Sequence, residues 1–320
     1  MKFGIIKAAA LIACLAAGDA SAQSFPQRTV RFLLPFGPGS GTDIVTRIIG
    51  QPLGIALNQS IVIDNRVGAN GGIAAAYVAK APADGYTLFA STNSPHSANP
   101  FLLKNVGYDP VKDFVPITRI GSFTLMMVIH PSIPVKTLPE LVAYAKANPG
   151  KLTYGSGNTS GILAGETLKR FAGVDILQVP YKSVPPALND VIGGRVSMSF
   201  SDLTPGLPHV KSGTLRALAI TRLVRSTLLP ELPTFDESGL TGFEVESWAG
   251  FFAPAGTPPD IITRLNTEMR KIIDDPKIKA QIANVGFEAF SSSPQELGEF
   301  VKVQLAKNAK MIKDAGIEPE

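Results

Sequence analysis

Residues 30–45 read VRFLLPFGPGSGTDIV, and this stretch decides the fold. Its first seven residues, 30–36, are mostly large and apolar, which predicts a buried strand. A glycine-rich turn follows at once, and we expect a helix to begin at Asp43. A strand that leads through a short glycine turn into a helix is the first half of a βαβ unit, so the sequence predicts an α/β fold.

The alternation of strands and helices continues along the chain and occurs twice. After residues 30–36, the expected strands are 60–64, 87–91, 152–156, 176–180, 196–200 and 215–221. The expected helices are 72–81, 160–172, 185–193, 204–212 and 295–314. This order predicts two mostly parallel sheets with helices on both faces.

Two extended apolar stretches, 114–131 and 243–254, connect the two sets of strands. We interpret them as the two strands of a hinge between two domains. Domain 1 is expected to comprise 23–122 plus 246–320, and domain 2 to comprise 123–245. In such a fold a ligand cleft lies between the domains, at the carboxyl ends of the strands.

The first 22 residues have the features of a secretory signal peptide. Two lysines near the start precede an apolar run over 8–17, and Ala20-Ser21-Ala22 is a small-x-small cleavage pattern. We expect cleavage after Ala22 and export from the cytoplasm. In an alternative interpretation, Leu11-Ile12-Ala13-Cys14 is a lipoprotein cleavage box, and Cys14 becomes a lipidated N-terminus.

Composition excludes several classes of protein. The chain has 320 residues, a net charge of +4 and no cluster of Lys or Arg, which argues against a nucleic-acid partner. Cys14 is the single cysteine. If it leaves with the leader, disulfides, cysteine–zinc sites and cysteine catalysis are excluded together.

The glycine-rich turn after residue 36 predicts an anion site. Backbone N–H groups of Ser40, Gly41 and Thr42 would be free at the helix N-terminus, and Gly39 allows a ligand to approach closely. The pattern is GxGxG without a following lysine, so nucleotide binding is disfavoured. The alternative is a tight turn in which Thr42 or Asp43 caps the helix.

A second loop of this type, 155–161, joins a strand to a helix in the other half of the chain. Its polar residues could hold a ligand or simply form a capped turn. The loops that follow the neighbouring strands would lie beside these two. The candidate ligand-binding residues are Phe36, Gly39, Ser40, Gly41, Thr42, Thr92, Asn93, His96, Ser156, Asn158, Thr159, Ser160, Tyr181, Ser201 and Asp202.

Enzyme chemistry has little support in the sequence. His96, His130 and His209 are far apart, and neither HExxH nor a Gly-x-Ser-x-Gly elbow occurs. We therefore expect no catalytic residues, no metal and no cofactor. A structural or adhesive protein is disfavoured because repeats and low-complexity tracts are missing from the sequence.

Several motifs, which follow one another along the chain in a specific order, resemble those of a known family. They are PFGPGSGTD (35–43), IDNRVGANGG (63–72), KAPADGYTL (80–88), ANPGKLTYGSG (147–157), VPYKSVPPALNDVIGGRVSMSF (179–200), LPHVKSGTLRALAITRLVRS (207–226), ELPTFDESG (231–239) and FFAPAGTPPDIITRLN (251–266). With them, essentially the whole mature chain resembles the solute-binding receptors of tripartite tricarboxylate transporters, also called Bug receptors.

The resemblance implies a two-domain, Venus-flytrap binding protein of the periplasm. Its ligand would be a small organic acid: a di- or tricarboxylate, an amino acid or an aromatic carboxylate. Its partners would be the membrane subunits of a transporter, contacted transiently, and we expect a monomer. In the family one carboxylate is held largely by backbone amides, small polar side chains and ordered water of two loops, which correspond here to Gly39–Thr42 and Thr92-Asn93. The second domain contributes from the segments that correspond to 156–160 and Ser201-Asp202.

Three departures from the family pattern bear on the site. Ser40 stands where a further glycine is common, and Ser183-Val184-Pro185-Pro186 replaces Gly-Ser-Ala-Pro. Pro52 predicts that the first helix is kinked or broken near Gln51. Two other functions stay open at this point: a sensing receptor without its own transporter, and a secreted enzyme that uses the same cleft.

Overall fold

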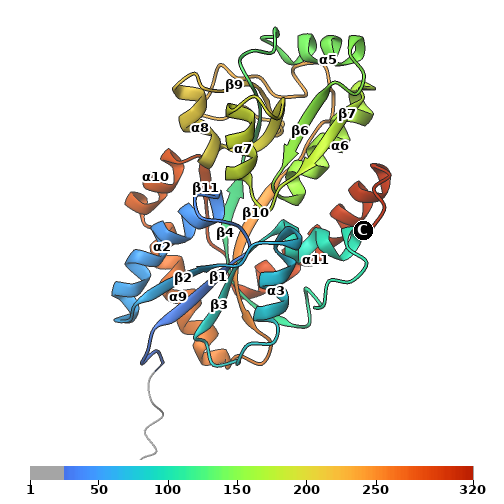
Figure 1. The fold of residues 1–320 in the computed structure, drawn as a ribbon. Coiled ribbons are helices and arrows are strands. Elements are labelled where there is room, and N and C mark those ends of the chain that lie inside the picture. The colour runs from blue at the N-terminus through green and yellow to red at the C-terminus, as the bar shows by residue number, and fades with distance from the viewer. Residues whose placement is uncertain (1–24, 320) are drawn as a thin grey trace, which may run out of the picture.

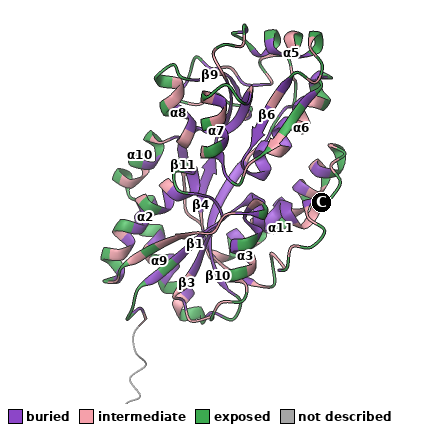
Figure 2. Cartoon of the chain, viewed as in Figure 1, coloured by how far each residue is buried: buried purple, intermediate pink, exposed green. Residues whose placement is uncertain are grey.

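The computed structural model describes residues 25–319, which form two β-sheets flanked by helices (Figure 1). The predicted leader and Cys14 lie outside the described residues. The inner strands of both sheets are mostly buried, whereas the edge strands β2 (Ile61–Asn65) and β7 (Ile176–Pro180) and the outer faces of the helices are partly exposed (Figure 2). We call the six-stranded sheet with its helices lobe 1 and the five-stranded sheet with its helices lobe 2.

The sheet of lobe 1 begins with the strand of the opening motif. In spatial order its strands are β11 (Phe287–Ala289), β4 (Phe114–Phe123), β10 (Ser247–Pro254), β3 (Thr87–Thr92), β1 (Val30–Leu34) and β2 (Ile61–Asn65). β1 pairs in parallel with β2 and β3, while the other three pairs are antiparallel. The carboxyl ends of β1 and β3 therefore meet at one edge of the sheet.

Helices cover both faces of this sheet. The helices α2 (Gly41–Leu57), α9 (Pro259–Asp274) and α10 (Pro276–Asn284) share one apolar cluster with it. The helices α3 (Gly72–Val78) and α11 (Pro294–Asp314) share another. Two short turns, η1 (Ala69–Gly71) and η2 (Ser94–Ala98), and the short helix α4 (Asn99–Leu102) complete the lobe. A capping box of Ser293 and Glu296 sets the start of α11.

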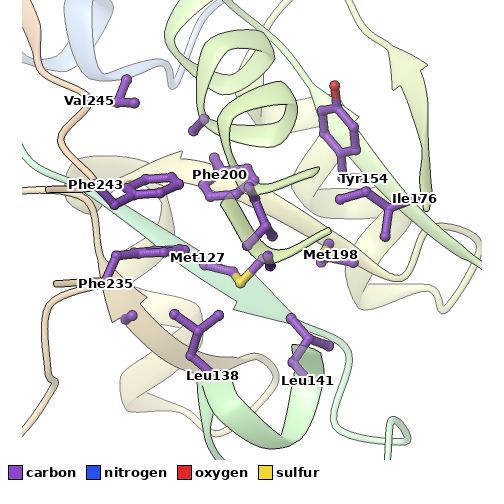
Figure 3. Packing of buried hydrophobic residues seen from close by; sticks show 14 of the residues in the cluster. Met127, Leu138, Leu141, Tyr154, Ile176, Met198, Phe200, Phe235, Phe243 and Val245 are labelled. Atoms are coloured by element: carbon purple, nitrogen blue, oxygen red, sulfur yellow. The ribbon is translucent and has the colours of Figure 1, made fainter. Parts of the chain in front are cut away.

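Lobe 2 repeats the strand–loop–helix arrangement. Its strands are, in order, β7 (Ile176–Pro180), β6 (Leu152–Ser156), β8 (Met198–Asp202), β5 (Leu125–Ile129) and β9 (Arg216–Ile220). Its helices are α5 (Leu138–Ala147), α6 (Thr159–Ala172), α7 (Val184–Ile192) and α8 (Leu203–Lys211). In the main core, Phe200, Phe235 and Phe243 lie close together beside Met127 (Figure 3).

The chain crosses between the lobes in two places. β4 passes through Thr124 into β5, and residues 221–246 lead back from β9 to β10. The Arg119 guanidinium donates to the Ser122 hydroxyl at 2.9 Å and to Glu246 Oε1 at 3.4 Å, so it joins the two crossings. The guanidinium also lies 3.7 Å from the ring centre of Phe300, which ties this junction to α11.

Two expectations about the elements need correction. Each sheet is mixed rather than mostly parallel, because the crossing strands β4, β5 and β10 enter antiparallel to their neighbours. Residues 41–57 form one helix in which Pro52 is an internal residue, so the predicted break near Gln51 is wrong. Val45, Ile49 and Leu53 are fully buried along this helix, and their contacts with the core hold it together on both sides of Pro52.

Candidate functional site

A small cavity lies where the carboxyl ends of strands from both lobes face each other. It has a volume of about 10 Å³, which is room for about one water molecule. The residues that line it come from both lobes and from the crossings; they are Phe36, Ser40, Thr42, Thr92, Asn93, Ser94, Phe123, Asn158, Val184, Asp202 and Ser247.

The first wall of the cavity is the turn between β1 and α2. Ser40 is the N-cap residue of α2, and its hydroxyl accepts a hydrogen bond from the backbone N–H of Asp43 at 3.4 Å. Gly39 has a positive φ of 79°, a conformation that favours glycine. The Ser40 N–H is not free as the sequence predicted, because it donates to the Gly37 carbonyl oxygen at 3.1 Å within the turn. The first backbone N–H groups of α2, those of Gly41 and Thr42, lie at the cavity end of the sheet.

Asp43 holds this turn in place from behind. Its carboxylate accepts from the Gly39 N–H at 3.1 Å, from Arg47 Nε at 3.0 Å and from Asn65 Nδ2 at 3.1 Å. Burial alone would raise the pKa of Asp43, but these hydrogen bonds outweigh it and hold the pKa below its usual value. The charge of Asp43 is thus satisfied within lobe 1.

The second wall is the loop after β3, which contacts lobe 2 directly. The Asn93 side-chain amide donates to Ser160 Oγ at 3.0 Å, and its oxygen accepts from Ser247 Oγ at 2.9 Å. Ser94 Oγ accepts from the backbone N–H of Thr159 at 3.2 Å. These bonds join lobe 1 to the first turn of α6 and hold the two lobes together around the cavity.

Lobe 2 presents the N-terminus of α6 and the end of β8. Asn158 is the N-cap residue of α6 and accepts from the Gly161 N–H at 2.8 Å. Asp202 ends β8, is 5% exposed, and has a carboxyl oxygen, Oδ1, without a hydrogen-bond partner in the described chain. Burial raises the pKa of Asp202 to about 7.

The chemistry of this lining suits an anion held by neutral groups. Hydroxyls, side-chain amides and the N-termini of two long helices converge on one small volume. Asp202 is the single ionisable side chain among the described lining residues. A carboxylate can be bound there by hydrogen bonds and helix dipoles without a cationic partner.

The structure brings most of the predicted site residues together. Phe36, Ser40, Thr42, Thr92, Asn93, Asn158 and Asp202 line the cavity. Gly39 and Gly41 lie in the turn that forms its first wall, and Thr159 and Ser160 form the lobe-to-lobe contacts. Ser201 is buried beside them, with its hydroxyl bonded to the carbonyl oxygen of Asp202.

Ser156 and Tyr181 lie apart from this cavity. They line a neighbouring cavity of about 310 Å³ between α4, β6 and the end of α11. There, Ser156 Oγ accepts from Gln178 Nε2 at 2.8 Å, and Tyr181 donates to Asp190.

His96 points into the core of lobe 1 instead of the cavity. It is fully buried, stacks on Phe252 at 3.8 Å and bonds through Nδ1 to Ser91 Oγ at 2.6 Å. Burial lowers the pKa of His96 to about 3, so the ring is neutral. His96 lies in the π-helical turn η2 and does not line the cavity that Asn93 and Ser94 line, so the prediction that it contacts the ligand does not hold in this structure.

Four lining residues were missed by the sequence analysis. Ser94 directly follows Asn93, so the same loop pattern could have found it. Val184 belongs to the departure at 183–186 noted above. Phe123 and Ser247 come from the crossing strands, where only the arrangement of the lobes places them at the site.

Two kinds of site are absent from residues 25–319, the part of the chain that the structure describes. That part of the chain contains no group of three or more His, Cys, Asp or Glu residues arranged to hold a metal ion. None of its helices is both long enough and apolar enough to span a membrane.

Comparison with known proteins identifies the family. The family model for the tripartite tricarboxylate transporter family receptor matches residues 45–317. The R. palustris protein Rpa4515, solved with adipate, is 38% identical and has a TM-score of 0.91; the match covers 92% of this chain and 100% of that one. The predicted family and the predicted two-sheet binding-protein fold are therefore confirmed.

Two other solved structures are similar over nearly the same length. The periplasmic binding protein BugD is 33% identical with a TM-score of 0.89, covering 92% of this chain and 100% of that one. MatC (Rpa3494) from Rhodopseudomonas palustris, with bound malate, is 29% identical with a TM-score of 0.85, covering 90% of this chain and 100% of that one.

Proposed function

This chain belongs to the tripartite tricarboxylate transporter receptors, a family of non-enzymatic periplasmic binding proteins, and we propose that it binds a small organic acid between its two lobes. The observation that carries this proposal is the lining of the cavity. Neutral donors and the N-termini of α2 and α6 converge there from both lobes, without a lysine or arginine among the described lining residues.

We infer that the ligand is a dicarboxylate of about four to six carbons. Two relatives that are 38% and 29% identical hold adipate and malate. One carboxylate of such a ligand would accept hydrogen bonds from the backbone N–H groups of Gly41 and Thr42 and from the Thr92-Asn93 loop. The hydroxyls and amides of 158–160 would contact the rest of the molecule from lobe 2.

Binding requires the lobes to move apart and close again. The cavity of about 10 Å³ is far smaller than a dicarboxylate, so a ligand enters only when the contacts of Asn93 and Ser94 with α6 break. We propose that residues 23–122 with 246–320 and residues 123–245 move as two domains. The crossings at Thr124 and at 221–246 would serve as the hinge.

The family relationship also supports a proposal about where the protein acts and which partner it contacts. We propose that the protein is exported with cleavage after Ala22 and acts in the periplasm. There it would deliver its ligand to the membrane subunits of a tripartite transporter through a transient contact, as the family relationship suggests.

Calorimetric titration of the exported protein with a panel of acids tests the function. The panel contains malate, succinate, adipate, citrate, glutamate and benzoate, and each acid is recovered afterwards and analysed. We expect micromolar or tighter binding of a C4–C6 dicarboxylate, with the ligand chemically unchanged. Absence of binding to every acid, or chemical conversion of one of them, would overturn the proposal.

A further inference from the structure

Asp202 is the one ionisable side chain among the described residues that line the cavity, and no cationic side chain pairs with it. It occupies the N-cap position of α8, yet its side chain makes no capping hydrogen bond to that helix. Its carboxyl group instead faces the N-terminus of α2. A Cβ placed on Gly41 would lie 3.4 Å from Asp202 Oδ2. The carboxyl group is therefore directed across the gap between the lobes, at the predicted anion site.

The elements packed against Asp202 offer no compensating charge. The ionisable side chains on α2, β4 and α8 are Asp43, Arg47, Arg119, His209 and Lys211. Those on β6, α6 and α7, which pack against β8, are Tyr154, Glu166, Lys169, Arg170 and Asp190, while β5 carries none. Asp43 and Arg47 pair with each other, and Arg119 pairs with Glu246. Among the described residues, none of these side chains forms an ion pair or a hydrogen bond with Asp202.

An ionised Asp202 would repel a bound carboxylate strongly, because both charges would lie in a small, closed volume without a cation. A protonated Asp202 reverses this effect, since a carboxylic acid O–H donates a hydrogen bond to a carboxylate. The same group therefore either opposes or assists the binding of an anion, depending on a single proton.

We propose that Asp202 determines the specificity of this cavity by binding the ligand carboxylate as a neutral acid, so that one proton is taken up together with the ligand. This inference rests on the proposed function. Asp202 Oδ2–H or Oδ1–H donates to a ligand oxygen, the proton comes from the buffer, and no covalent bond forms or breaks.

The ionisation of Asp202 agrees with this role. Burial alone raises the pKa of Asp202 to about 7. A carboxylate bound beside it would raise that pKa further, because two negative charges disfavour each other. Near neutral pH the free protein is therefore partly ionised at Asp202, whereas the complex is protonated. Affinity for an acid should fall as the pH rises above 7, up to about tenfold per pH unit.

The test measures proton uptake directly. Wild-type protein is titrated with adipate and with malate by calorimetry at pH 6.5, 7.5 and 8.5, in two buffers of different ionisation enthalpy. We expect uptake that rises from about 0.2 proton at pH 6.5 to nearly one at pH 8.5, with weakening affinity over the same range. Binding without proton uptake and with equal affinity at all three pH values would overturn the inference while leaving the proposed function intact. If neither these two acids nor any other acid of the panel binds, the inference and the proposed function are both overturned.

Three variants distinguish the neutral from the ionised form. Asp202→Asn keeps the shape and an N–H donor, so it should bind within about threefold of wild type at pH 6.5 and lose the dependence on pH. Asp202→Ala lacks the donor and should bind at least tenfold more weakly at pH 6.5. The control Asp260→Asn removes an exposed carboxylate at the start of α9 and should behave as wild type.

The opposite pattern would contradict the inference. If Asp202→Asn abolishes binding as completely as Asp202→Ala does, although both variants are folded and unfold at temperatures no lower than that of the wild type, the ionised carboxylate is the binding form. The preferred ligand would then carry an ammonium group, and glutamate should bind better than adipate.

Discussion

The side-chain amide of Asn93 donates a 3.0 Å hydrogen bond to the hydroxyl of Ser160, and this bond connects the two lobes at the cavity. Both residues are almost fully buried, so water does not compete for the bond in this conformation. Asn93 also accepts from Ser247 on β10. This one side chain of lobe 1 therefore joins lobe 2 to the start of the crossing strand β10.

Removal of the Asn93 side chain should weaken ligand binding. Asn93→Ala eliminates both hydrogen bonds, and we expect at least a tenfold loss of affinity for the best-bound acid of the panel. Ser160→Ala should have a smaller effect, and the double variant should show a coupling energy of about 1 kcal/mol between the two side chains. Calorimetry measures all three variants.

The control for the Asn93 and Ser160 variants is Asn284→Ala, which truncates an exposed asparagine at the end of α10. It should bind as wild type does. Strictly additive effects of the Asn93 and Ser160 substitutions would contradict a role for their hydrogen bond in the closed state.

A methyl group at Gly41 should prevent proper closure around the ligand. Its Cβ would lie 2.6 Å from the Phe123 ring, closer than van der Waals contact allows, and 3.4 Å from Asp202. Gly41 has an ordinary helical position, so Gly41→Ala should leave α2 intact and still weaken binding about tenfold or more.

Gly298→Ala provides the matched control because this glycine also lies in a helix, and its nearest neighbour would be Pro116 at 3.5 Å. We expect unchanged affinity and equal or higher thermal stability for that variant. Wild-type affinity in Gly41→Ala would show that the turn and Phe123 do not form a close wall.

The buried carboxyl of Asp202 should lower stability at neutral and alkaline pH. Because its pKa is about 7 in the folded protein and near 3.8 when unfolded, the folded state binds the extra proton between these values. The cost to stability begins near pH 4, grows until about pH 7 and is then constant, on the order of 4 kcal/mol. Asp202→Asn should therefore be more stable than wild type at pH 8 but not at pH 4, as measured by denaturant unfolding.

His96 should make the folded protein less stable as the pH falls, which is the reverse of the pH dependence expected from Asp202. The pKa of His96 falls from 6.5 to about 3 on folding, so the unfolded state binds more protons between these values. The stabilisation is complete above about pH 6.5 and is lost as the pH falls toward 3, by about 1.4 kcal/mol per pH unit. His96→Gln should show a shallower loss of unfolding free energy from pH 6 to pH 4. An unchanged slope would mean that His96 is not buried as a neutral ring.

Much of the site could be predicted from local sequence. The turn at Gly39–Thr42 and the cap at Asn158 depend on strand, glycine and cap residues within a few positions of each other, and such local preferences survive in the folded chain. After a strand ends, the direction in which a side chain points depends on the conformation of the turn that follows. His96 is three residues from Asn93, but the turn η2 directs it into the aromatic core, where no local pattern would have placed it.

The sequence alone determined the family, the two α/β halves and the two loops that form the walls of the cavity, because hydrophobic periodicity, glycine turns and helix caps act over short distances. The mixed sheets and the position of Phe123 and Ser247 at the site follow instead from how the crossing strands pair in the assembled fold. The tertiary structure also shows that Asp202 faces the N-terminus of α2 without a balancing charge. Strand direction and the charge around a buried group depend on residues far apart in the chain, so they emerge only when the lobes are assembled.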